Sequence, residues 1–461
     1  MPLDHDQTFS RENFKLIWDR ESRRNRDVYK FTPGLEDFRV EIKAALEARK
    51  VALKANPPSS KRHNETLEHH REVVTGIKQK RREHLEGILD EISDISLARI
   101  ANRNFNLGLR ELNKVNGKQT YSLDHSAAST YFTTKQLEVN LKSAFSMQVM
   151  NRHRMVEQIR ELLGDPSPKT FLKSDLASFY ESVSHARLME KLELSSTLSR
   201  ASVAFISELL NEYRRISGNT TGLPRGVGLS SFLAEIYLQN LDDEVRNMQG
   251  ITYYSRYVDD MVIIAHHKRH SRMNDSGLPR LRILVRNQGL QLNGSKTRVL
   301  HTSDSAAQFR SFRLLGYDFK TKLSAGRVEL DMSKERYDRH IRRIESIFQQ
   351  YYATRTASPE GAETALVARI RLLTTNHRSP KSVGTNLSGI AFTNRALQKA
   401  SPRMQKIDQH LRRRLDDPRI AARLRLRTEG MTVTKGFEEF TFSKFSPKHL
   451  ANSRKIWRYE N

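Results

Sequence analysis

The sequence predicts an α+β fold in which an antiparallel β-sheet is flanked on both sides by helical regions. Two observations predict it. Short segments rich in β-branched, aliphatic and aromatic residues, typical of strands, are interspersed with longer amphipathic stretches in the middle of the chain. Two of these segments, in ITYYSRYVDDMVIIA, meet at a tight turn and not across a helix, which indicates antiparallel pairing. This irregular order is typical of α+β proteins.

The charge of the chain points to a polyanionic partner. The 461 residues, room for roughly three units of about 150 residues each, carry a net charge of +26. The excess is uneven, because residues 331–461 hold 27 Lys and Arg against 13 Asp and Glu. A field of this strength attracts nucleic acid, and we expect binding that weakens steeply with salt.

Several classes of protein are excluded by what the sequence lacks. It has no cysteine, which excludes disulfides, cysteine-based zinc sites and a cysteine nucleophile and fits a reducing compartment. No run of about 18 apolar residues predicts a membrane span, and the first residues lack the basic-then-apolar pattern of a signal peptide. We therefore expect a cytoplasmic protein without a membrane partner.

The first third of the chain is predicted to be mostly helical. Residues 1–56 and 62–100 have helical patterns, separated by the helix-breaking stretch Pro57-Pro58-Ser59-Ser60. Alternation around Asn116-Gly117 predicts a β-hairpin, which is either a finger that grips nucleic acid or an ordinary surface hairpin. Residues 135–163 are predicted to form one more helix.

The middle of the chain has the strand signals. KTFLKSDLASFY predicts a strand that enters a turn, residues 185–217 a helix, and GLPRGVGLSS a glycine-rich loop before a further helix. The hairpin of ITYYSRYVDDMVIIA follows, then a helix over 276–290 and short strands in TRVLHT and FRLLGYDF. From Ser333 to about Arg427 the pattern is helical and basic.

Two acidic positions suggest chemistry. Asp175 ends a predicted strand, and Asp259-Asp260 lies at the tip of the predicted hairpin. Carboxylates held close together raise one another's pKa unless a hard cation such as Mg²⁺ neutralises them. Two such ions about 3.5–4 Å apart can activate a hydroxyl and stabilise a leaving pyrophosphate. An Asp-Asp turn at a strand end is also common without any such role.

The motifs around these aspartates, taken together, resemble those of the reverse transcriptases. Asp175 with Phe179-Tyr180, GLPRGVGLSS, Tyr257-Val258-Asp259-Asp260, GLQLNGSKT and LLGY occur in the order of that family within residues 171–319. The resemblance implies a right-hand polymerase with fingers, a palm built on an antiparallel sheet, and a helical thumb. We expect a helical N-terminal extension over 1–105, fingers and palm over 106–325, and a basic thumb and C-terminal region over 326–461.

The same resemblance assigns the catalytic roles. Asp175, Asp259 and Asp260 would be the catalytic residues and the ligands of two Mg²⁺ ions, with Asp260 either ligating or only supporting. The backbone amides of Leu176, Ala177 and Ser178 would face the triphosphate. Tyr180 stands where the family has its sugar gate, whose ring clashes with a 2′-hydroxyl; the alternative is a buried core aromatic.

Further residues of the nucleotide and primer sites follow from the motifs. Gly222 to Ser230 would form the loop over the new base pair, where Arg225 replaces a glutamine frequent in the family and could bind phosphate, and where Gly226 permits close approach. Other nucleotide-binding candidates are Lys296, near the pyrophosphate, and Arg154. The primer and template candidates are Tyr257, Val258, Leu315, Gly316 and Tyr317, the last three resembling a primer grip.

Longer stretches indicate a subgroup. NRHRMVEQIRELLGD, FLKSDLASFYESVSHARL and SGIAFTNRALQKASPRMQKIDQHLRRRL resemble the bacterial defence-associated and abortive-infection reverse transcriptases. This implies an RNA-directed DNA polymerase of antiphage defence that uses dNTPs, copies an RNA, such as a structured noncoding RNA, and makes DNA. The N-terminal extension would bind RNA, a protein partner or a second copy of the chain.

Four alternatives stay open. They are a retron- or intron-type reverse transcriptase, untemplated or protein-primed DNA synthesis, RNA synthesis on an RNA template, and a nucleic-acid-binding scaffold whose polymerase site is vestigial.

Overall fold

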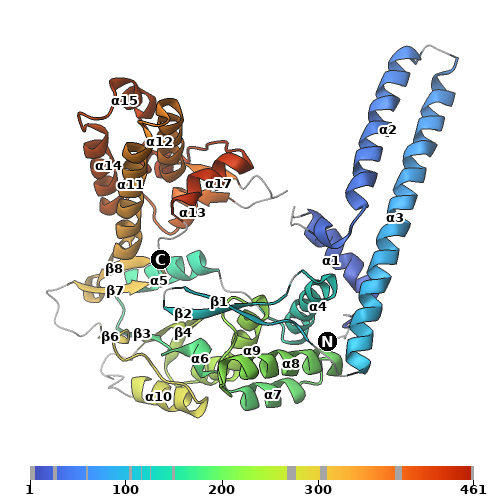
Figure 1. Ribbon diagram of the computed structural model, residues 1–461. Coiled ribbons are helices and arrows are strands. Elements are labelled where there is room, and N and C mark those ends of the chain that lie inside the picture. The colour runs from blue at the N-terminus through green and yellow to red at the C-terminus, as the bar shows by residue number, and fades with distance from the viewer. Residues whose placement is uncertain are drawn as a thin grey trace. The chain divides into compact units, whose positions relative to one another are not determined.

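The structure, a computed structural model, describes most of the chain as two compact units. One comprises Met1–Met147 with Ser184–Tyr237, and the other comprises Gln148–Val183 with Leu238–Asn461. Figure 1 shows their helices and strands. The described residues are 6–23, 28–58, 61–102, 106–115, 117–124, 126–147, 151–266, 277–301, 309–378 and 387–457.

The first unit is a set of helices with one β-hairpin. In chain order its elements are α1 (Arg11–Arg23), a 3₁₀ turn (Tyr29–Phe31), α2 (Leu35–Ala55), α3 (His63–Ala101), β1 (Arg110–Val115), β2 (Lys118–Ser122), α4 (Ala128–Ala144), α7 (His185–Glu193) and α8 (Arg200–Ser217). The helix α9 (Gly228–Arg246) begins in this unit and ends in the other.

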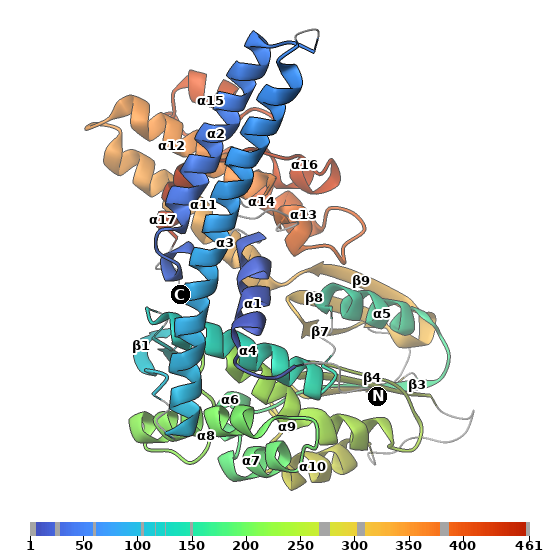
Figure 2. The same ribbon diagram turned by 90° about the vertical axis from the view of Figure 1, so that its right-hand side faces the viewer.

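A long helical hairpin is the main feature of the first unit. α2 and α3 lie side by side in Figures 1 and 2, and the 39 residues of α3 give it a length of about 58 Å. Leu85, Leu89 and Ile92 are buried along α3 at helical spacing. The same helix packs against α1, α4 and α8, so one end of the hairpin is anchored in the core of this unit.

The second unit is built on a four-stranded antiparallel sheet. Its strand order is β4-β5-β3-β6, formed by β4 (Ile251–Tyr257), β5 (Asp260–His266), β3 (Lys169–Asp175) and β6 (Arg298–His301). Every residue of β3 is buried, as expected for a central strand covered on both faces. The short helix α6 (Phe179–Ser182) follows β3, and α10 (Gly277–Asn287) follows β5.

A second sheet and a group of helices complete this unit. The three-stranded sheet has the order β7-β8-β9. One hydrophobic core joins α5 to both sheets and to the C-terminal helices. The elements are α5 (Arg152–Gly164), β7 (Arg310–Leu314), β8 (Tyr317–Lys322), a 3₁₀ turn (Leu323–Ala325), β9 (Arg327–Met332), α11 (Lys334–Thr354), α12 (Pro359–Thr374), β10 (Asn376–Arg378), β11 (Leu387–Gly389), α13 (Ile390–Thr393), α14 (Pro402–Leu415), α15 (Ala422–Thr428), α16 (Val433–Glu438) and α17 (Pro447–Lys455).

The predicted α+β class with an antiparallel sheet is confirmed. So are the helix predicted over 62–100, which is α3, and the hairpin of β4 and β5. The hairpin predicted around Asn116-Gly117 is formed by β1 and β2, although Asn116 itself lies outside the described residues. The division into 1–105, 106–325 and 326–461 stays a prediction.

Some predicted elements are wrong in extent. The helix predicted over 135–163 is two helices, because the chain turns at Ser146, with φ 45°, and restarts at Asn151, whose side chain caps α5. The helix predicted over 185–217 is likewise two, the second capped by Ser199. FRLLGYDF is a hairpin and not one strand, because Leu315 and Gly316 both have positive φ. Three further strands, β9, β10 and β11, were not predicted.

Among the helices that the structure describes, none combines the length and the apolar character that crossing a bilayer requires.

Candidate active site

The register of the four-stranded sheet brings the sequence-predicted aspartates together. Asp175, the last residue of β3, pairs with Asp260, the first residue of β5. Directly opposed residues of antiparallel strands have their side chains on the same face, about 4.5–5.5 Å apart at Cβ. Asp259 precedes Asp260 in the turn, and its carbonyl accepts a hydrogen bond from the amide of Leu176 at 3.2 Å. Residues more than 80 positions apart in the chain thus share one edge of the sheet.

The turn between β4 and β5 is tight and strained. Tyr257 pairs with Asp260, so Val258 and Asp259 are the two residues of the turn. Val258 has φ 57°, a left-handed conformation that is a genuine outlier for a β-branched residue. Such strain persists only where the surroundings hold it.

A buried ion pair holds this turn. Arg256 on β4 donates two hydrogen bonds to Asp242 on α9, at 2.8 and 2.7 Å, and a third to the carbonyl of Val258 at 2.9 Å. Tyr254 donates to the same carboxylate at 2.6 Å. The two charged side chains are only 6% and 10% exposed, so loss of one partner would leave a buried charge uncompensated, at a cost of about 3–5 kcal/mol. Sequence reasoning missed this support; its one signal is an arginine within an otherwise aromatic strand.

Burial and mutual repulsion make ionisation of Asp259 and Asp260 less favourable than in water. Burial, together with the negative charge of Asp175, raises the pKa of Asp259 to about 6. Burial also raises the pKa of Asp260, although the nearby ammonium of Lys173 opposes this shift. The site therefore concentrates more negative charge than its own surroundings neutralise.

Two lysines offset part of that charge. Lys296 donates to Asp175 at 2.8 Å, and Lys173 pairs with Asp260 at 3.2 Å. The hydrogen bond to Asp175 raises the pKa of Lys296. Asn293 supports Asp175 from the same loop, since its amide donates to the backbone carbonyl at 2.7 Å and its side chain to the carboxylate at 3.4 Å. Lys173 is buried, whereas the Lys296 side chain is 56% exposed and free to move.

Carboxylate oxygens are the ligands that hard divalent cations prefer, and Asp175 and Asp259 fit such an ion because it would remove the repulsion that raises the pKa of Asp259. In the described ranges, no three His, Cys, Asp or Glu side chains are already arranged as a metal site. Lysines contact one oxygen each of Asp175 and Asp260.

The backbone amides after Asp175 take part in hydrogen bonds within the protein. The amide of Leu176 donates to the carbonyl of Asp259, and that of Ala177 donates to the carbonyl of Gln291 at 2.8 Å. Their predicted place facing a triphosphate stays a prediction. So does that of Ser178, which is exposed and has φ 45°.

Comparison with known families agrees with this geometry. Residues 104–319, which include all three aspartates and the glycine-rich loop, match the family described as reverse transcriptase (RNA-dependent DNA polymerase). The chain carries a reverse transcriptase domain. The description of that family names an RNA-dependent DNA polymerase, and the predicted right-hand polymerase fold is confirmed. Reverse transcriptase domains in general use divalent metal ions and RNA templates.

Solved structures similar to the chain include three of telomerase from Candida tropicalis. The apo enzyme truncated from its C-terminal domain has 13% identity and a TM-score of 0.34, with 53% of this chain and 60% of that chain covered. The apo enzyme has 10% identity and a TM-score of 0.37, with 80% and 65% covered. The enzyme in complex with a TWJ fragment of telomeric RNA has 11% identity and a TM-score of 0.35, with 83% and 72% covered.

The chain thus spans less than two thirds of the length of the first two of these structures. With TM-scores below 0.5, the likeness adds nothing to the assignment. Comparison with curated proteins finds no match.

The glycine-rich loop of the reverse transcriptase domain lies in the first unit, where it is pinned to the β1–β2 hairpin. The amide of Tyr121 donates to the carbonyl of Arg225 at 2.7 Å. Gly226 has φ 98°, and a Cβ there would lie 2.8 Å from the Tyr121 carbonyl oxygen, so no other residue fits without strain. The roles of Arg225 and Gly226 in nucleotide binding stay predictions.

The residues predicted to form a primer grip lie at the β7–β8 turn. Leu315 and Gly316 are half-buried and form its tip, whereas Tyr317 is fully buried. The primer-grip role predicted for Leu315, Gly316 and Tyr317 stays a prediction. The carbonyl of Leu315 accepts a hydrogen bond from Arg152 at 3.0 Å. Arg154, the predicted nucleotide ligand, is exposed on the first turn of α5, and no contact with the aspartates is seen among the described residues.

Tyr180 and Tyr257 are both half-buried in the reverse transcriptase domain. Tyr180 lies on α6, with its ring centroid 5.8 Å from that of Phe179. Tyr257 packs against the hydrophobic core beside the turn. The sugar-gate role of Tyr180 and the primer contacts of Tyr257 and Val258 stay predictions.

We expect the pH dependence of stability to report the burial of Asp259. Its pKa is about 6 in the folded protein and about 3.9 in an unfolded chain. Such a group stabilises the fold below its unfolded pKa, and this contribution is lost as the pH rises through the folded pKa. With divalent cations chelated, Asp259→Asn should therefore raise the free energy of unfolding at pH 8, by about 1–2 kcal/mol after solvent screening, and leave it nearly unchanged at pH 4.

Urea denaturation at the two pH values measures this difference. Asp243→Asn is the matched control, because it removes an exposed carboxylate from α9. Equal stabilisation by Asp259→Asn at pH 4 and pH 8 would contradict the explanation by burial.

Proposed function

We propose that the chain synthesises DNA on an RNA template, with Asp175 and Asp259 as the ligands of two Mg²⁺ ions and Asp260 in a supporting role. The observation that carries the proposal is the register that pairs Asp175 with Asp260 beside the strained turn of Asp259. The match of residues 104–319 to the reverse transcriptase family supports it independently.

When bound, the two ions would activate the 3′-hydroxyl of a primer and neutralise charge on the leaving pyrophosphate. The residues of the chain divide the remaining tasks. Asp259, whose pKa is about 6, carries a proton part of the time near neutral pH and would lose it where positive charge is brought close. Lys296 would move from Asp175 toward the pyrophosphate, since its side chain is largely exposed. Lys173, which is buried, would keep hold of Asp260.

We infer that Tyr180 selects the sugar of the incoming nucleotide. It stands five residues after Asp175 on the helix that follows β3, and its ring is half-buried and packed against Phe179. A fixed ring at this place clashes with a 2′-hydroxyl and accepts a deoxyribose.

We infer the biological role, the cellular location and the kind of template from the sequence. The resemblance of three long stretches to defence-associated reverse transcriptases supports a role in bacterial antiphage defence, in the cytoplasm, with a structured noncoding RNA as template. The net charge of +26 supports an extended nucleic-acid contact, because each phosphate contact gains from the release of counterions.

Replacing the two adjacent aspartates together tests the active site. Asp259→Asn with Asp260→Asn should reduce dNTP incorporation on a primed RNA template by about 10³-fold or more, because the loss of metal-ion stabilisation is worth several kcal/mol. Incorporation of labelled dNTP in Mg²⁺ measures it, with Asp243→Asn as the control that keeps full activity. A double variant with more than a tenth of the parental rate would refute the site, and an inactive parent on every template would favour a binding scaffold.

The sugar gate predicts a change of substrate without loss of the site. Tyr180→Ala should admit ribonucleotides, with the ratio of dNTP to rNTP incorporation falling by about 10-fold or more, a change of about 1.4 kcal/mol in relative barrier. Tyr180→Phe keeps the ring and should keep the selectivity. Steady-state competition between dGTP and rGTP measures the ratio, and unchanged selectivity in Tyr180→Ala would contradict the assignment.

Co-purifying nucleic acid tests the template. One recurring RNA should be recovered with both the parent and the Asp259→Asn, Asp260→Asn variant, and DNA complementary to it only with the parent. Sequencing of both fractions measures this. A random sample of cellular RNA would argue against a dedicated noncoding template.

A further inference from the structure

A cavity of about 550 Å³ lies in the second unit, remote in sequence from the aspartates. Its walls come from the start of α5, one side of α11, the β10 and β11 strands with α13, and the end of α17. Its volume lies within the range of about 300–1,000 Å³ that small-molecule sites occupy. It has room for one small ligand or one chain end, and none of the described residues that line it belongs to the aspartate site or to the reverse transcriptase motifs.

The cavity is strongly and uniformly positive. As far as the structure describes the chain, its lining has no aspartate or glutamate, and it includes five arginines, namely Arg152, Arg336, Arg339, Arg343 and Arg454. Several of these charges face neutral partners. Arg336 donates to the carbonyl of Thr393 at 2.9 Å and to Asn394 at 3.2 Å, and Arg152 donates to the carbonyl of Leu315. Their positive charge is therefore positioned but not cancelled.

The pKa values of two histidines in the cavity wall are lowered by burial and by these arginines. Burial, with the charges of Arg343 and Arg339, lowers the pKa of His340 to about 4. Burial, with the charge of Arg454, lowers the pKa of His377 to about 4. Both are therefore neutral at physiological pH, because burial, the larger cause, and the neighbouring guanidinium charges both disfavour the protonated ring.

Hydrogen-bond donors are left over in the walls. Arg454 donates to Nε2 of His377 at 3.0 Å; an arginine can only donate, so the neutral ring carries its proton on Nδ1. That Nδ1 is buried without a partner, and so is the indole Nε1 of Trp457. Both side chains line the cavity and are more than nine-tenths buried. Buried donors without acceptors are costly and uncommon, so both nitrogens stand out among the polar atoms of these walls.

Flat apolar surface lies beside the charges. The guanidinium of Arg343 lies 5.2 Å from the ring centroid of Trp457, and that of Arg395 lies 4.9 Å from the centroid of Phe392. Phe392 and Trp457 both line the cavity. Aromatic and guanidinium planes are the surfaces on which nucleobases stack.

We propose that this cavity binds a nucleoside 5′-phosphate, with the phosphate among the arginines and the base against Phe392. The ligand is either a free nucleotide or the 5′-phosphorylated end of a nucleic-acid strand, which share this chemistry. The proposal goes beyond the polymerase function and does not depend on it.

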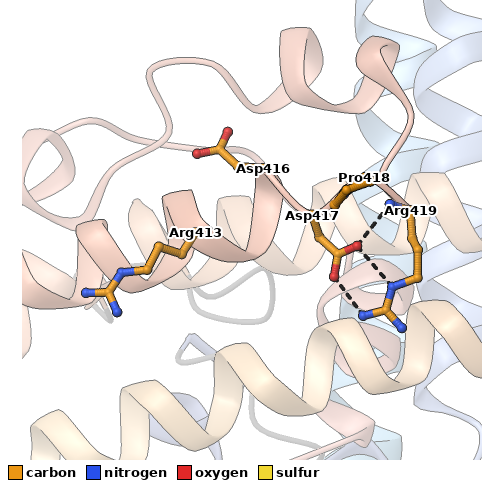
Figure 3. A pocket seen from close by; sticks show the side chains of 5 residues that line it. All are labelled: Arg413, Asp416, Asp417, Pro418 and Arg419. Carbon is orange, nitrogen blue, oxygen red and sulfur yellow. Dashed lines mark hydrogen bonds and ion pairs between the residues drawn. The ribbon is translucent and has the colours of Figure 1, made fainter.

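A second hollow of similar size has a lining with both positive and negative side chains and serves as a comparison. It has a volume of about 540 Å³ and is lined by two arginines, two aspartates and a proline at the end of α14. Figure 3 shows Asp417 facing Arg419, which donates to it from Nε at 3.0 Å and from a terminal nitrogen at 2.7 Å. Asp417 and Arg419 neutralise one another, and the two arginines and two aspartates of this lining together carry no net charge.

Equilibrium binding to the full-length chain in EDTA tests the proposal, because chelation removes metal-dependent binding at the aspartates. The probes are AMP, adenosine, and one short oligonucleotide with either a 5′-phosphate or a 5′-hydroxyl, followed by calorimetry. Phosphate should improve the affinity by at least about 10-fold, as expected of charge-assisted bonds to several arginines. AMP binding as tightly as the phosphorylated oligonucleotide would assign a free nucleotide, and tighter binding of the oligonucleotide would assign a strand end.

Arg339→Glu should weaken the binding of the phosphorylated probe by about 10-fold or more, since it reverses a charge in the lining. Arg339 is exposed, so the variant is expected to fold. Arg342→Glu, on the exposed side of the same helix and outside the lining, is the matched control and should bind as the parent does. The proposal is overturned if adenosine binds as well as AMP and the 5′-hydroxyl strand as well as the phosphorylated one, or if Arg339→Glu keeps parental affinity. The polymerase-inactive Asp259→Asn, Asp260→Asn variant should bind as the parent does, which separates this result from the polymerase assay.

Discussion

The antiparallel pairing of β3 with β5 is the constraint on which the catalytic arrangement depends. The aspartates come from separate segments, and only the register that sets Asp175 opposite Asp260 brings them to one edge. A slip by one residue would turn one of them to the opposite face of the sheet. The register is fixed by burial, because β3 is buried along its whole length and its two faces meet different partners. The core of the second unit thus determines where the carboxylates lie.

Two lysines offset part of the repulsion between the aspartates of the site. Burial of three carboxylates at one strand edge raises the pKa of Asp259 and Asp260, and two lysines relieve part of the strain. The lysines differ in a way that matters, since Lys173 is buried and Lys296 is mostly exposed. Lys173 is therefore the more fixed counter-charge of the two, and Lys296 is the one that we propose would leave Asp175 when a cation binds.

Much of the fold around the aspartates could be predicted from the sequence, because short stretches of residues determine these elements. The β4–β5 hairpin, the strand before Asp175 and the glycine-rich loop each follow from short patterns, and the family order of these motifs predicted the aspartates as a group. The break at Ser146 could not be predicted, because residues 135–163 contain neither a proline nor a glycine to mark it. The bond from Arg256 to Asp242, the engaged amides of Leu176 and Ala177, and the burial of Tyr317 all depend on which segments meet in space. The arginine cavity is the extreme case, since its walls come from five separate stretches of chain.

The turn between β7 and β8 is held from two directions. Arg152 at the start of α5 and Arg336 on the first turn of α11 both bind the carbonyl of Leu315, and the amide of Ser333, which caps α11, donates to Gly316 at 3.0 Å. The turn and the foot of this 21-residue helix are therefore mechanically one piece. A helix of this length extends about 32 Å. A tilt of α11 would therefore displace the β7–β8 turn at its start, by less than it displaces the far end of the helix.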